Sequence, residues 1–184
     1  MIREPCIAGT TVLETRKVFD EMVGAPMVDT AIARLPEADR RLYLEALPVS
    51  WIPTRIVDQV TVEISRLDGR SPENLQIASA RLSVERSLRG VWRMLLRVTT
   101  DDMLVTRTPT IFGRSYNCGL LVSKISRPGV ADVALRQWPE VSELQIVAIG
   151  AGIEAALRVA GRQNLRMTWK RSLEGAQWAI TWRA

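Results

Sequence analysis

The sequence predicts an α+β fold in which N-terminal helices pack on a mainly antiparallel sheet and the chain closes with a β-α-β-β unit. Helical spacing dominates the first half, where Ile56, Val60 and Ile64 recur as on the buried side of a helix. Alternation dominates the end, where Trp178 and Trp182 lie on one face of a strand. Helices that precede the strands, rather than alternate with them, are typical of α+β proteins.

The first half predicts several helices separated by Gly and Pro. Thr11 and Glu14 are spaced as a capping box, in which the two side chains satisfy free amides at a helix start. Ser71 and Pro72 are typical of an N-cap and a first helical residue. We expect helices over residues 11–23, 29–34, 37–47, 54–68 and 72–98, with Leu35, Leu42 and Ala46 on the buried side of the third.

The second half predicts the sheet. Residues 99–102 are expected to cap a short helix that Pro109 interrupts. The connector over residues 47–53 contains two prolines, which disfavour helix, and its Trp51 is expected to pack into a core. We expect strands over residues 120–125, 130–135, 143–149, 165–170 and 178–183, a turn over residues 127–129, and a helix over residues 153–160.

Length and composition are those of one folded domain covering residues 1–184. Hydrophobic residues make up 47% of the chain, yet no apolar run reaches the roughly 18–20 residues of a membrane span. The N-terminus lacks the apolar segment of a signal peptide, so we expect a cytoplasmic location. Cys6 and Cys118 are too few for a disulfide framework and are expected to be reduced.

The formal net charge of +5 is modest and comes mostly from arginine. The basic residues are spread along the whole chain, and no recognised nucleic-acid motif accompanies them. Nucleic acid is therefore not the expected partner.

The chain contains no histidine. Ser-His and Cys-His nucleophilic sites are excluded, and so are metal or haem sites that use an imidazole ligand. Asp101 and Asp102 are better explained as helix-capping charges than as an acid–base pair. Gly150-Ala-Gly152 is better explained as a close-packing turn than as a phosphate loop. We therefore expect a protein that is not an enzyme and that takes no cofactor, neither haem nor metal.

Three stretches occur in an order that carries a resemblance: Pro48-Val-Ser-Trp-Ile-Pro53, Thr108-Pro-Thr-Ile-Phe-Gly-Arg-Ser-Tyr-Asn-Cys-Gly119, and the closing unit that ends at Trp182. Most of the chain resembles an uncharacterised paralogous family abundant in myxobacteria. More distantly it resembles the superfamily of haem nitric-oxide-binding domains, vinyl-reductase-type sensor domains and Bet-type subunits of the TRAPP tethering complex.

The resemblance implies a sensor or interaction module with an apolar cavity between helices and sheet. The chain departs from the haem branch, because it lacks the proximal His and because Tyr116 is not followed by that branch's Tyr-x-Ser-x-Arg motif. It also lacks the cysteine cluster of the vinyl-reductase branch. Tethering subunits can carry an acyl chain on a cavity cysteine, a role for which Cys118 is the residue to consider.

We expect an apolar ligand site formed by Cys118, Tyr116, Phe112, Trp92 and Trp51. Cys118 lies between Asn117 and Gly119 at an expected helix-to-strand junction. Its thiol either faces the ligand or acts as a small buried apolar group, which is the common role of a free cysteine. The aromatic residues either line the pocket or fill the core.

A partner surface is expected along one face of the long helix, at Arg86, Arg89, Arg93 and Arg97, and Trp138, in a loop-like context, is also expected to contact a partner. This arginine stripe is suited to an acidic protein surface, a phosphorylated partner or nucleic acid. The alternative is an ordinary solvated helix face.

These observations predict a non-catalytic sensory or regulatory domain that binds a small apolar ligand between helices and sheet. We expect a homodimer with a protein partner, in which the ligand shifts the population of two conformations. The alternative is a protein–protein interaction module with a filled core and no small-molecule ligand.

Overall fold

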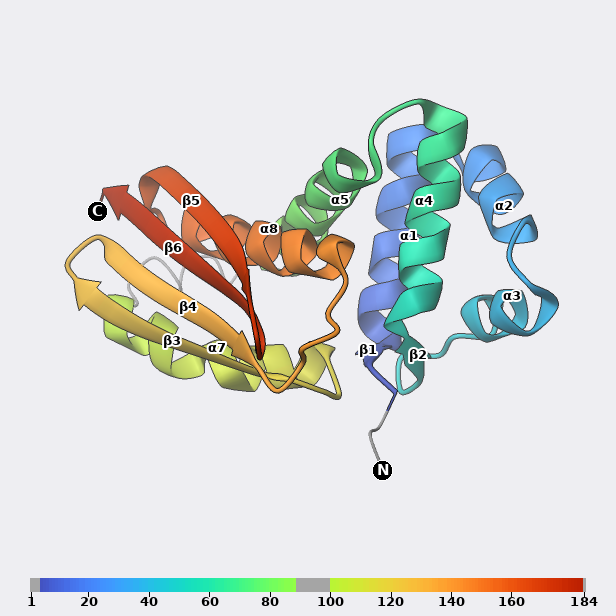
Figure 1. Ribbon diagram of the computed structural model, residues 1–184. Coiled ribbons are helices and arrows are strands. Elements are labelled where there is room, and N and C mark those ends of the chain that lie inside the picture. The colour runs from blue at the N-terminus through green and yellow to red at the C-terminus, as the bar shows by residue number, and fades with distance from the viewer. Residues whose placement is uncertain (1–3, 89–99, 184) are drawn as a thin grey trace.

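The computed structural model describes residues 4–88 and 100–183, and it is an α+β protein, as predicted (Figure 1). Figure 1 shows α1 to α4 at one end of the molecule and the main sheet at the other. The elements in chain order are β1 (Cys6–Ala8), α1 (Gly9–Val23), α2 (Ala25–Ala33), α3 (Glu37–Leu44), β2 (Trp51–Pro53), α4 (Thr54–Asp68), α5 (Pro72–Ser87), α7 (Asp101–Ser115), β3 (Leu120–Arg127), β4 (Val130–Arg136), α8 (Glu143–Val159), β5 (Gln163–Ser172) and β6 (Gly175–Arg183).

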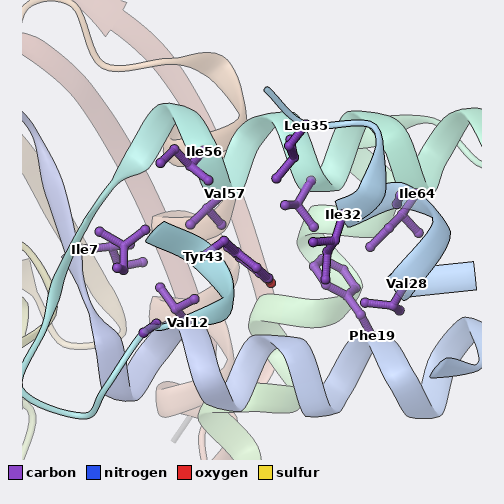
Figure 2. Packing of buried hydrophobic residues seen from close by; sticks show 14 of the residues in the cluster. Ile7, Val12, Phe19, Val28, Ile32, Leu35, Tyr43, Ile56, Val57 and Ile64 are labelled. Atoms are coloured by element: carbon purple, nitrogen blue, oxygen red, sulfur yellow. The ribbon is translucent and has the colours of Figure 1, made fainter. Parts of the chain in front are cut away.

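The N-terminal part has its own apolar interior, which we call the helical core. Helix α2 packs against both α1 and α4. Phe19, Val28 and Ile64 meet between these helices, and Tyr43 reaches in from α3 (Figure 2). Each large apolar side chain buried in this way stabilises the fold by roughly 1.5–3 kcal/mol. The helix expected over residues 54–68 is confirmed as α4.

A two-stranded sheet joins the start of the chain to the connector before α4. Strands β1 and β2 pair antiparallel, with Ile7 opposite Ile52. A Cβ atom on Gly9, the first residue of α1, would lie 1.9 Å from the carbonyl oxygen of Leu47. Glycine is therefore needed at position 9, because the connector passes so close. A single bridge between Ile7 and Tyr116 brings β1 to the end of α7 as well.

The main sheet has four antiparallel strands in the order β3-β4-β6-β5. Both expected hairpins, β3–β4 and β5–β6, are confirmed. Along β4 and β6 alternate residues are buried, among them Leu135, Trp178 and Ile180, and they pack with residues of α7 and α8. We call this second interior the sheet core. The other face of the sheet points outward.

The strand expected over residues 143–149 is wrong, because these residues form the first half of α8. Residues 145–151 are all buried, so the run shows neither strand alternation nor a helical stripe. Periodicity cannot separate a buried strand from a buried helix in such a run. Ser142 caps the helix by accepting a hydrogen bond from the backbone N–H of Gln145. The β-α-β-β order is instead formed by β4, α8, β5 and β6.

Other helix boundaries also differ from the expectations. Helix α1 begins at Gly9 without a side-chain cap, so the predicted capping box at Thr11 is wrong. Helix α7 continues through Pro109 instead of breaking there. Leu42 is 48% exposed rather than buried, because α3 turns Tyr43 toward the core. Helix α5 ends at Ser87, and the rest of the expected helix to residue 98 lies mostly outside the described residues.

Candidate functional site

The helical core and the sheet core meet at a cluster of polar side chains, which we call the junction network. It consists of Asp58 in α4, Tyr116 directly after α7, and Ser142 and Gln145 at the start of α8. Three elements that are far apart in the sequence therefore contribute to it. Gln145 is 1% exposed, so this is a polar site within a packed interior.

The hydrogen bonds of the junction network form a continuous chain. The Ser142 hydroxyl donates to one carboxylate oxygen of Asp58 at 2.6 Å, and the Gln145 side-chain amide donates to the other at 2.6 Å. The Tyr116 hydroxyl donates to the Gln145 side-chain oxygen at 3.0 Å. Each polar group thus has a partner, as buried polar groups require. The network links the end of α7 to α4 through the first turn of α8.

Burial controls the protonation of this network. Removal from water raises the pKa of Asp58, and its hydrogen bonds from Ser142 and Gln145 offset part of that rise. Burial also raises the pKa of Tyr116, and the nearby Asp58 carboxylate raises it further. Tyr116 therefore stays protonated and acts as a hydrogen-bond donor. The arrangement suits a coupling element between two packed parts.

Three aromatic rings pack beside the network, and we call them the aromatic cluster. Phe112 stacks on Tyr116 with ring centroids 4.8 Å apart and planes 22° apart. Tyr116 also contacts Trp138 with ring centroids 5.6 Å apart. The structure thus brings together Phe112 and Tyr116, two of the predicted ligand-site residues. Trp138 was predicted to contact a partner, but it is 4% exposed and belongs to the sheet core.

Cys118 lies next to the aromatic cluster and is half-buried against the sheet core. Neighbouring Asn117 holds this segment to β1: the Cys6 N–H donates to its side-chain oxygen at 2.7 Å, and its own N–H donates to the Cys6 carbonyl at 3.1 Å. Burial and the nearby Cys6 raise the pKa of the Cys118 thiol to about 11. The thiol is therefore protonated at neutral pH and is a poor nucleophile.

The other predicted site residues lie elsewhere. Trp51 is 45% exposed rather than packed in a core: it is the first residue of β2, and only the two residues that follow it in this strand are buried. Arg86 donates from both terminal guanidinium nitrogens to the Glu21 carboxylate of α1, so a neighbouring helix of the same chain already engages its charge. Trp92, Arg89, Arg93 and Arg97 lie outside the described residues.

Sequence reasoning missed Asp58, Ser142 and Gln145. Gln145 does leave a signal, because it is a polar residue inside an otherwise apolar run. Asp58 leaves little, since a carboxylate on an amphipathic helix is normally solvated. Their association depends on how α4 and α8 pack, which local patterns do not reveal.

Comparison with known proteins identifies the fold. No family model matches the chain, and no curated protein matches it. Among solved structures, an "Fe(II) unliganded H-NOX protein" from K. algicida has a TM-score of 0.72 at 13% identity, over 96% of this chain and 97% of that chain. A mutant of H-NOX from T. tengcongensis has a TM-score of 0.64 at 15% identity, over 96% of this chain and 97% of that chain.

A third neighbour, described by the words "Modulating Heme Redox Potential Through Protein-Induced Porphyrin Distortion", has a TM-score of 0.68 at 12% identity, over 95% of this chain and 99% of that chain. At these identities the likeness establishes the fold, which is that of the haem nitric-oxide-binding branch of the predicted superfamily. The resemblance to the myxobacterial family, to vinyl-reductase-type sensors and to tethering subunits stays a prediction.

These neighbours overturn the expectation that the chain takes no cofactor. That expectation rested on the missing histidine, whereas the same fold carries haem in a solved neighbour. The step from no histidine to no haem was itself too strong, because Cys thiolate, Met and Tyr also ligate haem iron. The half-buried Cys118 thiol supplies such a donor beside the aromatic cluster, and an iron centre would deprotonate it on binding. Tyr116 is the less suitable ligand, because its hydroxyl already donates a hydrogen bond to Gln145.

Proposed function

We propose that the chain is a non-catalytic sensory domain that binds an apolar ligand of haem size. The observation that carries this proposal is the likeness of nearly the whole chain to H-NOX structures, at a TM-score of 0.72. Haem is the first candidate, because a neighbour with this fold is described by its haem chemistry. The second candidate ligand is an apolar molecule that contains no iron.

The ligand is proposed to act through the end of α7. Phe112 and Tyr116 belong to the aromatic cluster, and Tyr116 also belongs to the junction network. A ligand that displaces the Tyr116 ring would therefore change the hydrogen bond to Gln145, and with it the contact to Asp58 in α4. A ligand that favours one of two such arrangements shifts their populations by its difference in affinity.

Titration of the purified protein with hemin, followed by the Soret band, tests the proposal. We expect saturable binding at one site, with thiolate-type absorption if Cys118 ligates the iron. Cys118→Ser should then weaken binding or change the Soret position, whereas Cys6→Ser, which alters the other cysteine beside it, should not. Thermal midpoints of both variants check that they remain folded.

Native mass spectrometry distinguishes the two candidate ligands. If hemin does not bind but the purified protein carries a persistent extra mass that is lost on denaturation, the ligand is an iron-free apolar molecule. A clean apo mass together with no hemin binding would contradict the sensory proposal.

A protein–protein interaction module is the second candidate, and one observation favours it. Leu42, Leu44, Leu47, Val49 and Trp51 are all large apolar residues between 45% and 85% exposed, and they lie close together in the sequence. Exposed apolar clusters of this kind mark interaction sites. We propose that this segment, called the connector patch, contacts a second copy of the chain.

The charges beside the connector patch suit such a pairing. Glu37 pairs with Arg40 in α3, and Arg41 pairs with Glu45 directly after it, so exposed side chains of both signs border the patch. A patch with both signs of charge can meet its own copy across a twofold axis with opposite charges facing each other.

A further inference from the structure

The outward face of the main sheet is a surface that the proposed sensory function does not use. Outward residues alternate with those of the sheet core along β4 and β6, and the described part of the chain places no helix over them. A shallow trough of about 580 Å³ crosses this face and is lined by residues of all four strands. An antiparallel sheet can leave one face to water, so exposure alone does not make this a binding site.

The charge of this face is strongly one-sided. Its outward positions carry six basic residues and one acidic residue; the basic ones are Lys124, Arg127, Arg136, Arg166, Lys170 and Arg183, and the acidic one is Asp132. Within the described residues, only Arg136 of the six forms a salt bridge, to Glu174 at 3.7 Å. Asp132 accepts a hydrogen bond from Ser126. The face therefore presents a positive field that its own side chains leave largely unneutralised.

Most side chains at the centre of the face are short, whereas those at its two edges include long basic ones. Ala134 on β4 lies opposite Gln177 on β6, and Gln177 lies opposite Lys170 on edge strand β5. In the next row, Ala179 lies between Asp132 and Thr168, and Lys124 follows on the other edge strand, β3. Small side chains in the middle allow a close approach of another backbone. The lysines stand at both edges of that strip.

We propose that this outer sheet face docks an acidic helical segment of a partner protein. A helix is the element that ordinarily covers the open face of a sheet, and the alanines of the central strip give it room. Glutamate or aspartate side chains along its flanks would meet the edge lysines and Arg136. Such complementarity gives orientation and fast association more than raw affinity.

Two other anionic partners fit the same face less well. Proteins that bind single-stranded nucleic acid stack bases on aromatic side chains, and no outward position of these four strands carries an aromatic residue. Binding to an anionic membrane surface usually combines basic residues with inserted apolar side chains. The outward positions offer Leu120 at one end of an edge strand, Val122, Val130 and alanines, and no cluster of large apolar side chains.

Fluorescence anisotropy with a labelled helical peptide of about 20 residues, with Glu on its flanks and Ala on one face, tests the proposal. Lys124→Glu with Lys170→Glu should weaken binding at least about tenfold. Lys17→Glu with Arg41→Glu makes the same change in net charge on the N-terminal helices, and it should change binding by less than about twofold. Backbone amide shifts in NMR spectra should move at Ala134, Gln177 and Ala179 when the peptide is added.

Three outcomes of these binding measurements would overturn the proposal. Equal weakening in the two double variants would show that only net charge matters. Tighter binding to single-stranded RNA or to phosphatidylserine vesicles than to the peptide would assign the face to another class of partner. Absence of binding by the wild-type protein at low ionic strength would also overturn it. Hemin binding is measured separately, so its failure leaves this test unaffected.

Discussion

Asp58 is the residue through which the helical core and the sheet core share a polar contact. Its carboxylate accepts hydrogen bonds from two side chains at the start of α8, Ser142 and Gln145. Leaving a buried donor without its partner costs about 1–3 kcal/mol. This residue therefore holds α8 against α4 in a specific orientation, although its buried charge is itself unfavourable.

We predict that Asp58→Asn changes how stability depends on pH. Burial raises the pKa of Asp58 above its ordinary value of 3.8, so the folded state favours the protonated acid. The stability that Asp58 contributes is therefore complete below its unfolded pKa and is lost as the pH rises through its folded pKa. Relative to Asp58→Asn, which does not titrate, the wild type should lose free energy of unfolding over this range.

Urea unfolding of both proteins at a series of pH values between about 3 and 7 measures the difference, because other groups titrate alike in both. Parallel curves would show that Asp58 has the same pKa folded and unfolded. A wild type that gains stability relative to the variant as the pH rises would mean that hydrogen bonding outweighs burial.

Helix α8 is the element around which the sheet core is arranged. It packs along α5 on one side and contacts β5 on another, which explains why its first half is buried all round. Gly150 faces the sheet: a Cβ atom there would lie 2.7 Å from the Trp178 ring nitrogen and 3.3 Å from the Met167 sulfur. The glycine therefore allows the helix to approach the Trp178 ring.

Two glycines of α8 should respond oppositely to alanine. Gly150→Ala should destabilise the protein by about 1–3 kcal/mol, because the added methyl overpacks the contact with Trp178. Gly152→Ala should be neutral or stabilise by up to about 1 kcal/mol, since alanine favours helix. The nearest described atom to its Cβ is a Val84 methyl at 3.5 Å, which is an ordinary contact. Chemical denaturation of the two variants checks this.

Similar effects at both positions would contradict the packing described for α8. Loss of stability in Gly152→Ala alone would place the tight face of the helix on the α5 side instead of the sheet side.

At the scale of the whole molecule, two interiors are joined by the junction network, by β1 and by α5, which packs against α1, α4 and α8. None of the described helices is both long enough and apolar enough to cross a membrane. The fold is shared with H-NOX structures that have only 11–15% identical residues. The fold therefore does not depend on most of the particular side chains.

We predict that the chain is a homodimer that buries the connector patch. Leu47→Glu with Val49→Glu should yield a monomer, because charges at positions 60% and 85% exposed would have to be desolvated in the interface. Leu173→Glu is the matched control: this residue is 96% exposed in the β5–β6 turn, away from the patch. Sedimentation velocity measures all three proteins. A wild-type monomer at tens of micromolar would exclude this interface.

Only part of the candidate site could be predicted from the sequence. Phe112, Tyr116 and Cys118 were predicted to lie together, and their closeness in sequence makes this possible once a helix and a strand meet there. Trp138 was placed on the surface because it follows a strand in a loop-like context, yet it is buried. Polar partners such as Asp58 come from elements that are distant in sequence, so no spacing rule could associate them.

The sequence by itself determined the fold class, helix α4 and both hairpins of the main sheet, because each depends on local periodicity and turn residues that short-range physics can interpret. Only the tertiary structure decided that residues 143–149 are helical, that Trp51 is exposed and that Asp58 meets Gln145. These outcomes depend on which surfaces become buried against each other. Burial is a property of the assembled chain, and an apolar run that is buried on all sides carries no period from which its conformation can be inferred.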